Sequence, residues 1–403
     1  MANTRLSRTA GAPTLNTKYT ISVWVKRAKL GGDNFIMDGR IDASNRFKLA
    51  FQSANKLEIW NSHSGSDTFA LNTNRVFRDT NGWYNIILSV DTTDATAGDR
   101  VKLYVNGVRE TSFSSTTDPS QNDANNVINE NGAGVYIGDY SGGSNAFGGC
   151  MSHFHFIDGT AYDASAFGST DSTTGEWEIN TSPTVTYGNN GFFILKNDNV
   201  INDQSGNANN FTLSSGTLTK TEDCPSNVFA TLNPLYYQTG GEGVVLANGN
   251  TSCSYSSDSS RSAFGTIANN TGKYYFEAKL NTAGTAPCIG IMNLAWQDLN
   301  KASGYAFQDS ALNFGYLADG NKTSGGSSSS FGDTYTNGDI IGVAVDLTNS
   351  KLYFSKNGVW QNSGVPTSGA TGTGSAFDLS STATYTSACR IRNGGDWSFN
   401  FGN

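Results

Sequence analysis

The chain alternates short apolar and polar runs at the period of β-strands. Residues 338–346 place apolar side chains at every second position, and after a polar turn 351–355 is predicted to return as the second strand of a β-hairpin. Residues 83–91 and 100–108 repeat this pattern: an apolar strand that ends in Asp, a turn, and a Lys-Leu-Tyr strand that ends in Asn-Gly. Each half of the chain therefore predicts a hairpin of the same design.

Further apolar alternations predict more strands. In the first half they are 4–9, 19–25, 46–51, 56–60, 151–157 and 191–196; in the second half 272–277 is predicted to open a sheet. Few stretches show helical periodicity, and turn residues separate the runs throughout. This pattern is typical of an all-β protein in which helix is minor.

The length favours two domains. We predict two tandem antiparallel β-sandwiches of the jelly-roll type, because each half of the 403 residues is large enough to bury its own core. The first spans 1–213, with its core in 4–165 and a closing segment at 187–213. A linker over 214–239 and a second sandwich over 240–403 follow.

Composition excludes several classes of function. The formal net charge of -8, with no cluster of Lys and Arg, argues against nucleic-acid binding. No apolar run is long enough to span a membrane, and the N-terminus lacks the apolar core of a secretory signal. The five cysteines are odd in number and widely scattered, so we expect them to be reduced.

Candidate catalytic groups are sparse. Glycosidases built on such sandwiches carry paired carboxylates on one strand face, and the nearest pair here is Glu176 and Glu178, on either side of Trp177. The surrounding loop offers no burial that would raise the pKa of an acid. We therefore predict that the protein is not an enzyme and name no catalytic residue.

Metal-ligating patterns are weak. His153 and His155, with Cys150 nearby, could supply zinc ligands, but one strand cannot easily wrap a tetrahedral ion, so we expect ordinary hydrogen-bonded residues on a polar face. Segments 138–143 and 203–207 offer oxygen donors suited to calcium, and Asx turns explain the same residues without an ion. No cofactor or metal ligand is predicted, and calcium stays as an alternative.

Recognition is the remaining possibility. Trp60 is out of phase with Leu57 and Ile59, which places it on the opposite face of its strand. Four further aromatic residues lie in or beside turns rich in Gly, Asn and Ser: Tyr140, Trp296, Tyr316 and Trp360. Exposed aromatic rings near amide and hydroxyl groups suit stacking on sugars or contact with a partner protein, so these five are the predicted binding residues.

Two domain families are resembled. Residues 338–358 and 272–277 resemble the central hairpin and the opening strand of SPRY domains, over about residues 240–403. The hairpin 83–108 resembles that of laminin-G or concanavalin-like jelly rolls. The resemblance implies lectin-like and protein-binding modules, with no chemistry of their own in the SPRY part.

The combination resembles virion proteins of marine tailed bacteriophages. The segments that carry this resemblance are 24–27, 156–159, 187–192, 203–211 and the Pro-Asn-Phe-Ala-Thr-Leu-Asn-Pro connector at 225–234. In that family a laminin-G-like domain is commonly followed by an SPRY-like domain. The resemblance implies a virion protein that is assembled in the bacterial cytoplasm, where neither a signal peptide nor disulfides are needed.

Several functions agree with this resemblance. We expect a non-enzymatic tail fibre or other adhesive appendage that binds host-surface glycan or protein. The alternative is a capsid decoration or head fibre that binds other virion proteins, and a polysaccharide depolymerase is a distant third. Expected partners are other virion proteins, a host-surface glycan and further copies of the chain.

Overall fold

The computed structural model describes residues 3–196, 200–235, 243–295, 307 and 310–402. The chain divides into two compact units, Met1–Val228 and Phe229–Asn403. Strands make up 46% of the structure and helix 4%, and all of the paired strands are antiparallel, so the predicted all-β class with two sandwiches is confirmed. In the described part of the chain, no helix is long and apolar enough to cross a membrane.

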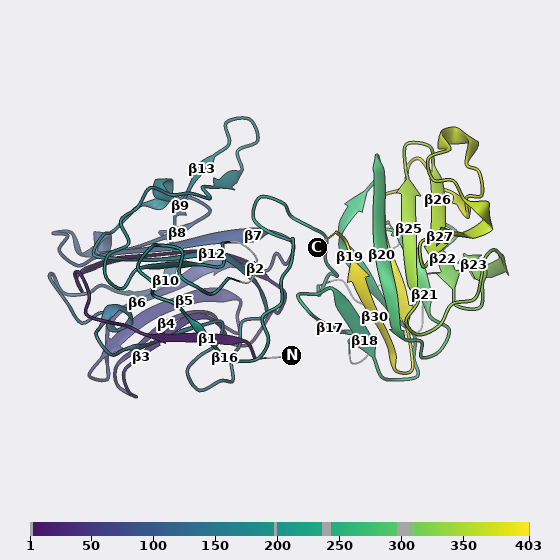
Figure 1. Ribbon diagram of the computed structural model, residues 1–403. Helices are drawn as coiled ribbons and strands as arrows, with labels where there is room; N and C mark the ends of the chain where they lie inside the picture. The colour runs from purple at the N-terminus through teal and green to yellow at the C-terminus, as the bar shows by residue number, and fades with distance from the viewer. Residues whose placement is uncertain (1–2, 197–199, 236–242, 296–306, 308–309, 403) are drawn as a thin grey trace. The chain divides into compact units, whose positions relative to one another are not determined.

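The first unit consists of two sheets that lie face to face (Figure 1). The eight-stranded sheet has the order β10 (Phe113–Thr117), β6 (Ser66–Val76), β5 (Lys56–His63), β4 (Arg46–Phe51), β3 (Asn34–Arg40), β11 (Gly134–Ile137), β1 (Arg5–Thr9), β16 (Thr212–Ser215). The six-stranded sheet has the order β15 (Phe192–Ile194), β12 (Gly149–Asp158), β2 (Lys18–Arg27), β7 (Trp83–Asp91), β8 (Val101–Val105), β9 (Val108–Arg109).

The core of this unit lies between the two sheets. Every second residue of β5 and β8 is buried there, as their alternation predicts. A smaller apolar cluster, which includes Ile87, Ile157 and Phe167, covers the outer face of the six-stranded sheet beneath the segment that carries β13 (Gly168–Thr170) and β14 (Trp177–Ile179). Short 3-10 turns complete the unit at η1 (Ala97–Asp99), η2 (Val127–Asn129) and η3 (Ala164–Ala166).

The second unit repeats the two-sheet plan (Figure 1). One sheet has the order β17 (Val245–Ala247), β18 (Ser252–Tyr255), β30 (Gly395–Asn400), β20 (Lys273–Thr282), β25 (Ile340–Asp346), β26 (Lys351–Lys356), β27 (Val359–Trp360), and β28 (Phe377–Asp378) also pairs with β26. The other has the order β19 (Arg261–Asn269), β29 (Tyr385–Ile391), β21 (Cys288–Asn293), β22 (Phe314–Leu317), β23 (Asn321–Ser324), β24 (Ser327–Ser330). Two 3-10 turns, η4 (Gln361–Ser363) and η5 (Gly369–Thr371), follow β27.

The segment predicted as a linker, 214–239, is shared between the two units. Asp223 lies in the first unit, where its carboxylate pairs with buried Lys26 at 2.5 Å and accepts a hydrogen bond from Trp83 Nε1 at 2.9 Å. Leu232 is fully buried in the core of the second unit. Much of this segment is therefore anchored to one sandwich or the other.

Candidate functional site

The outer face of the eight-stranded sheet carries the candidate site. One register row crosses it, through Thr212 on β16, Ser7 on β1, Tyr136 on β11, Asp38 on β3, Lys48 on β4 and Trp60 on β5. Leu57 and Ile59 are fully buried while Trp60 is half-buried, so the predicted alternation of this strand is confirmed. Tyr136 and Trp60 lie three strands apart, which corresponds to about 14 Å across the sheet.

Arg46 brings two predicted binding residues together. Its Cζ lies 5.6 Å from the centre of the Trp60 ring and 5.6 Å from the centre of the Tyr140 ring. Tyr140 also packs against Phe35, with ring centres 5.7 Å apart. These contacts hold the two half-buried rings at one place on the sheet, although 80 residues separate them in the sequence.

The turn at Tyr140 and Ser141 is held by side chains from β1 and β3, the strands on either side of β11. Arg5 donates from Nη1 to the Ser141 carbonyl at 2.7 Å, and Arg40 donates from Nη1 to Ser141 Oγ at 3.1 Å. The Ser141 amide donates to Asp38 Oδ2 at 2.9 Å. Because each bond reaches the same turn, the turn and the arginines fix one another in position.

Asp38 is the charged centre beneath this turn. Burial raises the pKa of its carboxyl, while the Ser141 amide and the nearby Arg46 guanidinium act in the opposite direction. Its ion pair with Arg46 spans 3.4 Å, and the Asp38 side chain is fully buried. The carboxylate thus orients Arg46 from below and is not itself available to a ligand.

We call the solvent-accessible part of this face the arginine-aromatic surface; its residues are half-buried and comprise Arg5, Arg40, Arg46, Trp60, Tyr136 and Tyr140. Arg5 Cζ lies 5.7 Å from the centre of the Tyr136 ring. Two glycines make room for the tyrosines, since a Cβ on Gly142 would lie 1.8 Å from the Tyr140 hydroxyl, and one on Gly134 would lie 2.8 Å from the Tyr136 hydroxyl.

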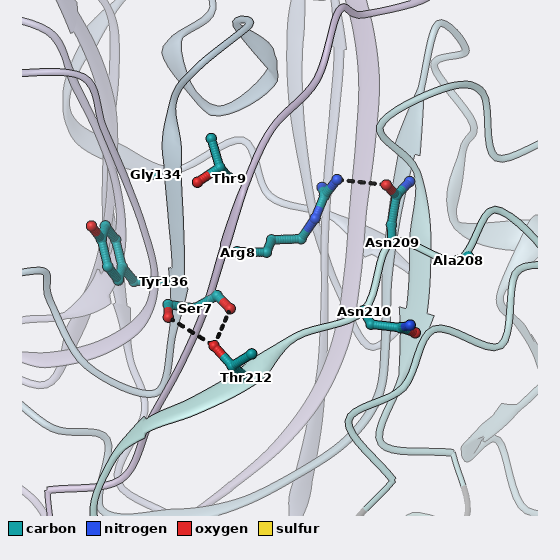
Figure 2. Close-up of a pocket in the computed structure, with 9 residues that line it drawn as sticks. All are labelled: Ser7, Arg8, Thr9, Gly134, Tyr136, Ala208, Asn209, Asn210 and Thr212. Atoms are coloured by element: carbon teal, nitrogen blue, oxygen red, sulfur yellow. Dashed lines mark hydrogen bonds between the residues drawn. The ribbon is translucent and has the colours of Figure 1, made fainter.

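A depression of about 430 Å³ adjoins this surface at Tyr136 (Figure 2). Its lining is mostly polar and comes from β1, β11, β16 and the segment before β16: Ser7, Arg8, Thr9, Gly134, Tyr136, Ala208, Asn209, Asn210 and Thr212. Tyr136 lies on one side and the two asparagines on the other, and Arg8 donates to Asn209 Oδ1 at 2.6 Å. Amides and hydroxyls therefore line a hollow beside the aromatic rings.

The sequence prediction missed Arg46 and Tyr136. A signal for Arg46 was present, because pairing the predicted strands 46–51 and 56–60 as a hairpin places Arg46 and Lys48 on the same outer face as Trp60. Tyr136 faces outward between buried Val135 and Ile137 on a four-residue strand. That strand is too short for its alternation to stand out.

Tyr316 of the second unit is not at the surface. It is fully buried on β22, its hydroxyl donates to the carbonyl of Asp333, and its ring packs 5.2 Å from that of Tyr335. The expectation that this ring is exposed is wrong. The adjacent loop suggested a turn position, but the residue alternates inward with Phe314 on its strand.

Trp360 is half-buried on β27, and its ring contacts Tyr275 of β20 at 6.2 Å in an edge-on arrangement. Tyr275 was not predicted, yet 51% of it is exposed. Burial, followed by the hydrogen bond to Glu277 at 2.8 Å, raises the pKa of Tyr275 to about 12. Trp296 lies outside the described residues.

The groups considered for chemistry are dispersed. Glu176 and Glu178 are both exposed, and Glu178 pairs in register with Ser169 in the small β13–β14 hairpin. His153 and His155 are buried, in contrast to the polar face expected for them, because the segment that carries Tyr187 and Phe193 covers this side of β12. The two histidines therefore do not face solvent, whereas the two glutamates do.

The loops considered for calcium use their carboxylates internally. Asp139 Oδ1 accepts from the amides of Tyr140 and Asn145, and Asp203 accepts from the amides of Phe193, Ser205 and Asn209. Across the residues that the structure describes, no group of three or more His, Cys, Asp or Glu could hold a metal ion. These carboxylates fix the loop conformation, and the bond from the Ser205 amide to Asp203 has the spacing of an Asx turn.

Comparison with known proteins identifies both units. Residues 3–166 match the family described as the concanavalin A-like lectin/glucanases superfamily, and residues 273–390 match the SPRY domain. A Ran-binding proteins 9/10 homolog of Drosophila melanogaster is 36% identical over 96 residues, which is 23% of this chain and 10% of that protein. Ran-binding protein 9 of Mus musculus is 32% identical over 90 residues, which is 22% of this chain and 13% of that protein.

Among solved structures, the SPRY domain of human HERC1 shares 16% identity with a TM-score of 0.33, and the match covers 43% of this chain and 98% of that one. The matches to the two Ran-binding proteins, in contrast, cover only 10% and 13% of the length of those proteins. Domains of both kinds are typically binding domains without catalysis. The chain carries a concanavalin A-like domain of the laminin-G type, followed by an SPRY domain.

Proposed function

We propose that this protein is a non-enzymatic structural component of a tailed-bacteriophage virion, and that its first unit binds glycan on the host surface. The phage assignment rests on the sequence segments that resemble virion proteins, above all the connector at 225–234. The glycan assignment rests on the arginine-aromatic surface.

The observation that carries the glycan assignment is the meeting of Trp60 and Tyr140 at Arg46. Aromatic rings that stay half-exposed and are fixed by a neighbouring guanidinium offer apolar faces to sugar rings at small entropic cost. The adjoining depression adds the hydroxyls of Ser7 and Thr212 and the amide of Asn210, which suit the hydroxyls of a sugar. Single-site affinity is expected to be modest, and many copies on a virion would multiply it.

The second unit supports a complementary role in protein binding. Relatives of the chain are named Ran-binding proteins, and on the second unit exposed Tyr275 packs edge-on against half-buried Trp360. We propose that it contacts another virion protein. If the protein is an adhesive appendage, this contact attaches it to the particle.

The test uses protein coupled densely to beads, together with surface polysaccharide extracted from the host. Trp60→Ala should reduce retention of the polysaccharide at least about tenfold and destabilise the first unit by only about 1–2 kcal/mol, because the ring is half-buried. Trp177→Ala is the matched control, since Trp177 is also half-buried but lies in the β13–β14 hairpin. The recovered polysaccharide should be unshortened.

Two results would count against this proposal. Retention that Trp60→Ala leaves unchanged would remove the arginine-aromatic surface from the binding site. If the beads retained no host polysaccharide but captured empty phage heads, the proposal of a glycan-binding appendage would be wrong, and the alternative of a capsid decoration would take its place. Image reconstruction of the particle would then give the location of the protein.

A further inference from the structure

We infer that the glycan bound on the arginine-aromatic surface is acidic and carries carboxylate or sulfate groups; this rests on the proposed function of the first unit. Arg5, Arg40 and Arg46 come from three strands, β1, β3 and β4, and meet around the turn at Tyr140 and Ser141. Their convergence is unusual in a chain whose net charge is -8.

The charge of this surface is only partly compensated. Arg5 and Arg40 donate to neutral oxygens of Ser141, and within the described residues neither forms an ion pair with a carboxylate. Arg40 lies within electrostatic reach of Asp42, whose carboxylate already accepts from the amides of Ser44 and Asn45. Arg46 alone has a direct ionic partner, the buried Asp38.

The guanidinium groups are also held in place before any ligand arrives. The recorded hydrogen bonds of Arg5 use Nε and Nη1, and that of Arg40 uses Nη1, so each retains further N–H groups. A planar guanidinium donates two parallel hydrogen bonds to a carboxylate or sulfate, which a lysine cannot do. A fixed arginine therefore loses little side-chain entropy when it binds such a group.

A glycan fits the neighbourhood better than a nucleic acid does. On this acidic protein the three arginines are joined by Arg8 in the adjoining depression and by Lys48, which pairs with Asp33 and Glu58. Nucleic acids need a more extended basic stripe. The polar depression beside Tyr136 supplies amides and hydroxyls for the uncharged part of a sugar chain. Stacking on Trp60 and ion pairing with Arg40 would then act on different parts of the same polymer.

The experiment measures retention of two matched probe pairs by the full chain coupled to beads: dextran sulfate against dextran, and polygalacturonate against its methyl ester. We expect each charged polymer to bind at least about tenfold more tightly than its uncharged partner, and high salt to weaken that binding. Arg40→Gln should lose about tenfold in affinity for the charged polymers. Arg109→Gln, which changes an exposed arginine on β9, should lose nothing.

Arg46→Lys adds a second readout. It keeps the charge but removes the planar group between Trp60 and Tyr140, so affinity should fall without any change in net charge. If the charged and uncharged polymers bind equally well, the inference fails while glycan binding stands. If neither charged polymer binds, the inference fails, and the host polysaccharide decides the proposed function separately. Binding of duplex DNA as tight as that of dextran sulfate would also overturn it.

Discussion

Two buried histidines of the first unit should make its stability depend on pH. The His155 ring stacks on Phe193 at 3.9 Å, and its Nδ1 lies 2.9 Å from the Tyr187 hydroxyl. Burial, with a smaller contribution from Lys196, lowers the pKa of His153 to about 4. Burial also lowers the pKa of His155 well below its ordinary value. Both rings are therefore neutral in the folded protein.

The consequence is a loss of stability in mild acid. An unfolded histidine takes up a proton near pH 6.5, whereas folded His153 resists it down to about pH 4. The free energy of unfolding should thus fall as the pH drops through this window, by up to about 1.4 kcal/mol per pH unit for each histidine.

His153→Asn tests this directly, because Asn tolerates the left-handed backbone at this position, where φ is 47°. Urea unfolding of the variant should show a shallower decline between about pH 7 and about pH 5 than the parent protein. Parallel pH curves for the two proteins would mean that His153 does not contribute.

At the scale of elements, local pattern predicted the strands well. The predicted bounds 46–51 and 83–91 coincide with β4 and β7, and the predicted face of Trp60 is confirmed. These features could be predicted because the alternation of apolar and polar side chains depends only on residues that are close in sequence. The contact of Arg46 with Tyr140 could not be predicted in this way. It depends on the order of β4, β3 and β11 in the sheet, which is set by long-range pairing.

The segment before the second unit shows the same limit. Its prolines and polar residues predict a linker, but Asp223 reaches back to Lys26, and both side chains are almost fully buried. Asp223→Ala would leave the Lys26 ammonium without this partner in a buried site and remove the acceptor for Trp83 Nε1. We expect the first unit to lose about 3–5 kcal/mol of unfolding free energy.

Thermal unfolding of the full chain measures this effect, because the transition of the second unit should stay where it is. Glu222→Ala is the control. The Glu222 carboxylate, next to Asp223 in the sequence, is 63% exposed and pairs with Lys220, so its loss should change stability little. A drop of less than about 1 kcal/mol for Asp223→Ala would show that the ion pair is not needed.

At the scale of the whole molecule, each unit has its own core and should fold alone. Fragments 1–228 and 229–403 should both be soluble, with β-type circular dichroism spectra and cooperative unfolding. Fragment 1–220 is the informative comparison, because it keeps β16 (Thr212–Ser215) and the other sheet strands of the first unit but lacks Asp223. It should be less stable than fragment 1–228 by about the cost of Asp223→Ala, since both changes leave Lys26 without that carboxylate. Equal stability of fragments 1–220 and 1–228 would mean that residues 221–228 do not stabilise the first unit, whereas aggregation of both 1–228 and 229–403 would contradict independent folding itself.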